Sequence, residues 1–172
     1  MKDNAAYVAV FGVVILAASY LVFAVNEDSS LAASLTVNTF VDTTIGAATL
    51  AFGSLNPATV NNAATENPVL LTNTANSNIA VDIYLNNTNM TSGGNTIRFS
   101  NMSINTTNNA PGKRLNGTAF INGTGANTGF YEDLAVSGSV NFYFFHDVPA
   151  AQTAGAYTST VVVHSVSNAS VP

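Results

Sequence analysis

No residue of this 172-residue chain is cysteine, and only 8% of its residues are charged. Without cysteine, the chain cannot form a disulfide, a zinc–thiolate site or a cysteine nucleophile. About a quarter of the residues in an average soluble protein are charged, so the groups that normally keep a protein surface solvated are scarce here. Asn, Ser and Thr side chains, or sugars attached to them, must take over this role.

Basic residues are especially few. Lys and Arg together number 4, and the net charge is −5. Outside Lys2 and Arg98, the basic residues are the neighbours Lys113 and Arg114, which is too little positive charge to neutralise a phosphate backbone. Nucleic acid is therefore not an expected partner.

The longest pattern in the sequence is an apolar run over residues 5–25 that contains no charged residue. As a helix, this run would be about 31 Å long, which is enough to span the hydrocarbon core of a bilayer. We predict an N-terminal hydrophobic helix within residues 1–34 and a second domain over residues 35–172. The side chains expected to hold the helix in an assembly are Tyr7, Phe11, Gly12, Val14, Leu16, Tyr20 and Phe23.

Three interpretations of this run remain open. It could be a cleaved signal peptide, although Asp3 cancels the charge of Lys2 and the run is longer than the usual signal core. It could be a simple membrane anchor. It could also serve first as an anchor and then as the core of a polymer, because small residues such as Ala9 and Gly12 let apolar helices approach closely.

From Leu35 onward, short stretches rich in β-branched and aromatic residues alternate with turn-forming residues. In residues 79–85, apolar residues occupy every odd position, which predicts that Asp82 faces solvent. About eight strands at this spacing indicate an immunoglobulin-like β-sandwich. The expected strands cover residues 35–41, 47–52, 69–74, 79–85, 96–99, 102–105, 119–121, 140–145 and 157–166.

The order of an apolar N-terminal run and a polar β-domain resembles that of archaeal type IV pilins and archaellins. The resemblance implies a mainly β fold class with one long N-terminal hydrophobic helix, in which the helix forms a filament core and the β-sandwich faces outward. The motifs FGSLNP at 52–57 and GAYTSTV at 155–161 also resemble secreted immunoglobulin-like modules of microbial surface proteins. Both resemblances imply an extracellular location.

Seven Asn-x-Ser/Thr sequons are present, six of them within residues 86–124. Seven is a mild excess over chance in a chain so rich in these residues, but their crowding into a turn-rich segment favours attached glycans. N-linked glycans would supply the solvating layer that charges do not. The candidate acceptors are Asn86, Asn89, Asn101, Asn105, Asn116, Asn122 and Asn168.

Catalytic patterns are weak. His146 precedes Asp147, and His164 is in the last expected strand, but neither lies near a nucleophile motif or a set of metal-ligand spacings. Glu132 and Asp133 lack the spacing of a calcium loop. We therefore expect no catalytic residue, no metal and no cofactor.

The sequence thus predicts a structural protein, a subunit of an extracellular pilus-like filament used for adhesion or surface contact. Its partners would be the membrane before assembly and further copies of itself, joined through the N-terminal helix. The alternatives are a membrane-anchored or secreted surface glycoprotein that does not polymerise, and a filament subunit that donates a strand after signal cleavage.

Overall fold

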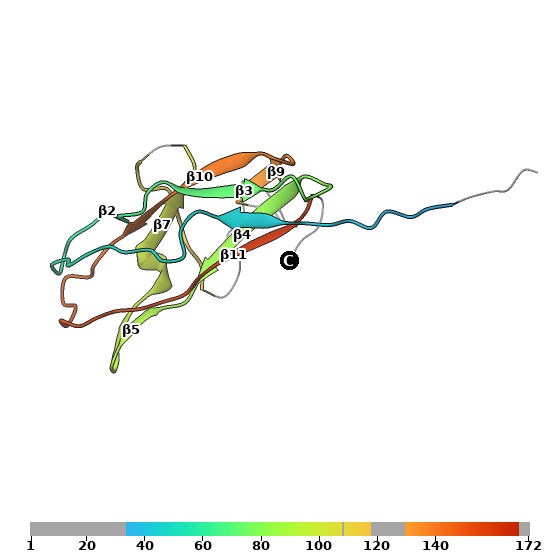
Figure 1. Ribbon diagram of the computed structural model, residues 1–172. Coiled ribbons are helices and arrows are strands. Elements are labelled where there is room, and N and C mark those ends of the chain that lie inside the picture. Colours follow the sequence, from blue (N-terminus) through green and yellow to red (C-terminus); the bar gives the residue numbers. More distant parts are fainter. Residues whose placement is uncertain (1–33, 108, 118–129, 169–172) are drawn as a thin grey trace, which may run out of the picture. The chain divides into compact units, whose positions relative to one another are not determined.

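The computed structural model describes residues 34–107, 109–117 and 130–168 (Figure 1). The chain divides into two units between Val37 and Asn38. All the strands described below belong to the second unit, residues 38–172.

The larger sheet is antiparallel and has β10 (Ser139–His146) at its centre, because this strand carries the longest aromatic and β-branched stretch. Its order is β1 (Thr43–Ile45), β3 (Val69–Asn73), β10, β7 (Met102–Asn105) and β8 (Lys113–Arg114), and β2 (Asn62–Ala63) also pairs with β10. Between the residues of β10 that pair with β2 and those that pair with β3, the Asn67 side chain binds the backbone of Phe144. Asn67 Nδ2 donates to Phe144 O and Asn67 Oδ1 accepts from Phe144 N, both at 2.8 Å.

The smaller sheet has β4 (Val81–Asn87) between β11 (Val161–Ser167) and β9 (Tyr131–Leu134). A separate hairpin joins β5 (Met90–Ser92) and β6 (Asn95–Ile97). Its turn contains Gly93 at a φ of 57°, a backbone conformation that favours glycine. One turn of 3₁₀-helix, η1 (Phe99–Asn101), precedes β7.

The two sheets share one hydrophobic core, so the domain is a β-sandwich-like structure (Figure 1). Phe142 and Phe144 from β10 are fully buried, and their rings meet edge to face at 6.4 Å between centroids. Ile83 and Leu85 from β4 are also fully buried. The apolar faces of both central strands therefore pack against each other across the sandwich.

The expected fold class, mainly β with one long N-terminal hydrophobic α-helix, is wrong in its helix. Over the three described ranges, the only helical element is η1, and no helix has the length and hydrophobicity needed to cross a membrane. The run over residues 5–25 that suggested the helix lies outside these ranges. Hydrophobicity requires burial but does not specify a helix, and seven residues of this run are β-branched Val or Ile, which also suit strands.

The solvent-facing position expected for Asp82 is also wrong. Asp82 is only 7% exposed, and its Oδ1 accepts a hydrogen bond from the backbone N–H of Asp133 at 2.9 Å. Its neighbour Tyr84 is 1% exposed. The central strand β4 is therefore buried on both faces, so alternation along it does not separate core from solvent.

Candidate functional site: the open side of the sandwich

Each sheet ends in a strand with one unpaired edge on the same side of the sandwich. Among the described strands, β1 pairs only with β3, and β11 pairs only with β4. The two edge strands meet at one point, where Thr43 Oγ1 and Ser165 Oγ form a hydrogen bond of 3.0 Å. This contact closes one end of the gap between the sheets.

Beyond this contact, a groove of about 390 Å³ lies between residues 45–52 and residues 157–163. Ile45 and Leu50 line one wall, and Val161 and Val163 line the other. The buried side chain of Phe144 is part of the lining. The groove therefore reaches the hydrophobic core.

Strand register explains why the walls of this groove are apolar. Ile45 lies opposite Leu71 and Val163 lies opposite Leu85, and directly opposed residues in an antiparallel pair share one face of the sheet. Leu71 is 2% exposed and Leu85 is fully buried, whereas Ile45 is 45% exposed. The groove is thus a part of the sandwich core that no described residue covers.

A second hollow of about 780 Å³ lies beside the first, and Phe52 lines both. Two loops, residues 50–57 and 148–157, form most of its wall, and none of its lining residues is charged. His146 also lines it and is 3% exposed, with the ring of Phe52 at 5.4 Å between centroids. His146 Nε2 is buried without a hydrogen-bond partner.

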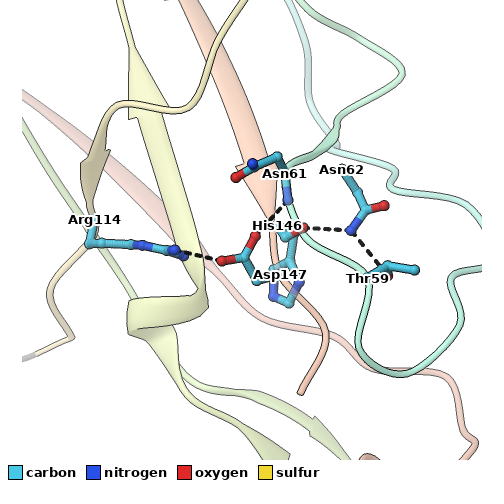
Figure 2. A network of polar contacts seen from close by, with 6 residues as sticks. All are labelled: Thr59, Asn61, Asn62, Arg114, His146 and Asp147. Atoms are coloured by element: carbon cyan, nitrogen blue, oxygen red, sulfur yellow. Dashed lines mark hydrogen bonds and ion pairs between the residues drawn. The ribbon is translucent and has the colours of Figure 1, made fainter. Parts of the chain in front are cut away.

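The backbone and acidic neighbour of His146 belong to a polar network (Figure 2). The Asp147 carboxylate accepts hydrogen bonds from Arg114 Nη2 at 2.5 Å and from the Asn61 backbone N–H at 2.6 Å. Asn62 Nδ2 donates to His146 O at 2.8 Å. These bonds join the end of β10 to β8, to β2 and to Asn61 just before β2.

The pKa values of His146 and Asp147 in this network are both lowered. Burial lowers the pKa of His146 below its ordinary 6.5, and the Arg114 charge lowers it further against the opposing effect of Asp147, so the neutral imidazole is favoured. Burial acts to raise the pKa of Asp147, but the hydrogen bonds from Asn61 and Arg114 outweigh it and the pKa is lowered. Because the Asp147 carboxylate binds Arg114 and Asn61, Asp147 and His146 do not have the Asp–His arrangement of a catalytic triad.

Within residues 34–107, 109–117 and 130–168, no group of three His, Asp or Glu residues could hold a metal ion. Glu132 and Asp133 are exposed on β9, and Asn168 Nδ2 donates to the Asp133 carboxylate. His164 is exposed on β11. The acidic and histidine residues that the sequence suggested are therefore not brought together.

The candidate glycosylation sites differ in how accessible their amides are. Asn89 and Asn168 are exposed, and Asn86, Asn101, Asn105 and Asn116 are half-buried. Asn89 uses its Oδ1 to accept from Phe99 N at 2.9 Å, which leaves its amide nitrogen, the atom that carries a glycan, on an exposed side chain. In contrast, Asn105 Nδ2 donates to Ala110 O at 3.2 Å. Asn89 is therefore the best placed of the described acceptors.

The remaining site predictions lie outside the described residues. These are Asn122 and the expected assembly residues Tyr7, Phe11, Gly12, Val14, Leu16, Tyr20 and Phe23.

The groove itself was missed by sequence reasoning. Residues 47–52 and 157–166 were both expected to form strands of the sandwich. The only available signal was the apolar character of residues 47–52 without a clear partner. In comparisons with known proteins, no family model, no curated protein and no solved structure matches the chain.

Proposed function

We propose that this protein is a non-enzymatic structural subunit of an extracellular surface filament, built from many copies of the chain. The observation that carries the proposal is the groove between β1 and β11, where apolar core is uncovered between two unpaired strand edges. Proteins usually protect strand edges, and exposed apolar surface marks sites of association. A subunit whose core is completed by another chain has both features.

The sequence supplies a second association element. Residues 5–25 are almost all apolar and carry no charge, and exposing so much apolar surface to water is unfavourable. Lipid would accommodate it before assembly, and neighbouring copies would accommodate it in the filament. Each large side chain buried in this way contributes roughly 1.5 to 3 kcal/mol.

An outward-facing role agrees with the surface of the β-domain. The domain has few charges and offers an exposed sequon at Asn89. Glycans there would replace the missing charged groups and keep the outside of a filament solvated. An intact subunit mass above that of the polypeptide would reveal them, and a mass equal to the polypeptide would contradict this part of the proposal.

The test of the proposal is electron microscopy of the purified full chain, combined with sedimentation of assembled material. We expect filaments from the wild type. We expect Val14→Asp to abolish them, because burying an unpaired charge between subunits would cost several kcal/mol. Val136→Asp, which changes a side chain already 39% exposed, is the control and should assemble normally. A full chain that stays monomeric in membranes or in solution would instead be a surface glycoprotein that does not polymerise.

A further inference from the structure

We infer that the groove between β1 and β11 binds residues 31–37 of a second copy as an added β-strand. This inference rests on the proposed function, since it names the contact by which one subunit of the filament holds the next.

The free edge of β11 offers backbone groups along the groove. Thr88 N–H donates to Thr160 O at 3.0 Å, so the even-numbered residues of this segment direct their backbone N–H and C=O groups toward β4. In an antiparallel ladder, the alternate residues then point their N–H and C=O groups to the other side. Val161 and Val163, which line the groove, therefore direct their backbone groups to the edge where no described strand pairs.

The backbone groups of β1 alternate in the same way. Gly46 N–H donates to Leu70 O at 2.7 Å, so the even-numbered residues direct their backbone N–H and C=O groups toward β3. Ile45, which lies beyond the Thr43–Ser165 contact, consequently directs its backbone groups to the free edge. The side chain of Ile45, like that of Val163, lines the groove. An incoming strand would thus find backbone partners at the edge and apolar contacts beneath it, which is the arrangement of β-strand addition.

Residues 31–37 have the properties of such a strand. Leu35 and Val37 are the most exposed large apolar side chains in the described part of the chain, at 88% and 74%, and residues 34–37 form no strand. The sequence places apolar residues at 31, 33, 35 and 37, with Ala32, Ser34 and Thr36 between them. One face of an extended segment would therefore carry the large apolar side chains, and the other would carry only the small side chains of Ala32, Ser34 and Thr36.

Length and charge also match. Seven extended residues span about 23 Å, and the groove wall over residues 157–163 is also seven residues long. Neither the lining of the groove nor residues 29–41 contain a charged side chain. Inserting the segment would therefore bury no charge.

The geometry of residues 38–42 favours a second copy as the donor. For the segment to enter the groove of its own molecule, the chain would have to turn back between residue 37 and β1. The backbone there is already committed, because Phe40 N–H donates to Asn78 Oδ1 at 2.8 Å and Asp42 N–H donates to Ser77 Oγ at 2.7 Å. Donor and groove then belong to different molecules, and the contact does not depend on how the two units of one chain are arranged.

Because the chain has no cysteine, the contact can be tested by engineered disulfides. Two full-length single-cysteine variants, Leu35→Cys and Val163→Cys, carry tags of different mass and are mixed during assembly. We expect a Leu35→Cys/Val163→Cys heterodimer after oxidation, since a disulfide requires the two Cα atoms to lie within about 7 Å. Val136→Cys replaces the groove variant in the control and should give no heterodimer.

A second measurement uses charge within the donor segment. Val37→Asp should lower the sedimenting fraction about tenfold or more, because it buries a carboxylate in the groove. Thr36→Asp is the matched control, since its side chain lies on the opposite face of the strand, and it should assemble as the wild type does. Both residues are exposed, so neither change affects the fold.

The outcomes separate this inference from the proposed function. Filaments that form equally well with Val37→Asp, or a cross-link to Val136→Cys as frequent as that to Val163→Cys, would overturn the inference and leave the filament proposal standing. A disulfide within one molecule of a Leu35→Cys/Val163→Cys double variant, without the heterodimer, would overturn the second copy as donor. A full chain that forms neither filaments nor heterodimers would overturn both.

Discussion

The gap between β1 and β11 is closed by polar contacts at one end and lined by apolar side chains at the other. At the Asp42 end, the Asp42 carboxylate accepts hydrogen bonds from Thr74 Oγ1 at 2.6 Å and Asn76 Nδ2 at 3.0 Å, and Thr43 meets Ser165 across the sheets. At the Leu50 end, residues 47–50 make no hydrogen bond to any other described residue, and the core is open. Short polar side chains close one end, and apolar side chains line the other.

This difference separates folding from association. The polar end satisfies its own backbone and side-chain groups, so it needs no partner. The apolar end leaves unpaired edges and uncovered core, which only another segment can satisfy. The closed end should therefore carry the stability of the isolated domain, while changes at the open end should mainly affect assembly.

The largest expected effect comes from comparing Leu71 with Ile45, which lie opposite each other on β3 and β1. Leu71→Ala should lower the free energy of unfolding by about 2 to 5 kcal/mol, because it leaves a cavity in the packed core. Ile45→Ala should cost about 1 kcal/mol or less, since its side chain is 45% exposed. Urea denaturation of both variants measures this, and equal losses would mean that the groove is covered within one molecule.

The next effect concerns a buried amide beside the closed end. Asn73 is fully buried, and its Nδ2 donates to Leu134 O at 2.9 Å and to Ile79 O at 3.1 Å. Asn73→Ala should lower the free energy of unfolding by roughly 2 to 4 kcal/mol, because it leaves the buried Leu134 carbonyl and the half-buried Ile79 carbonyl without this partner. Asn141→Ala, on an exposed position of β10, should cost less than about 0.5 kcal/mol. Similar losses in the two variants would show that the Asn73 bonds do not stabilise the domain.

Sequence reasoning worked best where a strand lies inside a sheet. The expected strand 102–105 coincides with β7, and the expected strand 140–145 lies within β10. Both segments have a strong local β preference, and both lie inside the sheet with a neighbouring strand on each side. Residues 35–41 and 47–52 have similar local preferences but form no strand. Whether such a segment pairs depends on a partner that local sequence does not specify.

The candidate site was less predictable because it depends on long-range register. The adjacency of His146 and Asp147 is visible in the sequence, but the pairing of Asp147 with Arg114 brings together residues 33 positions apart. The groove depends on which strands end the sheets, which is a property of topology. The burial of Asp82 follows from the central place of β4, and alternation within residues 79–85 could not reveal it.

A smaller effect, on the pH dependence of stability, is expected from His146, which lines the second hollow. Because burial lowers its folded-state pKa below the ordinary 6.5, the unfolded chain takes up this proton first as pH falls. Stability should therefore be fully present above pH 6.5 and should decrease as the pH drops below that value. His146→Gln should flatten this part of the profile of the urea midpoint against pH.

The matched control for this measurement is His164→Gln, which changes an exposed histidine on β11. Its profile should keep the decrease seen in the wild type. A flattened profile in His164→Gln, with an unchanged one in His146→Gln, would show that the buried ring next to the second hollow is not the group responsible.

The smallest expected effect tests the closed end itself. Hydrogen bonds from Thr74 and Asn76 lower the pKa of Asp42 below its ordinary 3.8, against a weaker opposing effect of burial. A lowered carboxyl pKa contributes stability that is present above 3.8 and is lost as the pH falls through the folded-state value. The melting temperature of Asp42→Ala should therefore lie below that of the wild type near neutral pH, and the two should converge in acid. Glu132→Ala, which removes an exposed carboxylate from β9, controls for the general loss of a negative charge. If the difference between Asp42→Ala and the wild type were independent of pH, the hydroxyl and amide contacts of Asp42 would not be what closes this end of the sandwich.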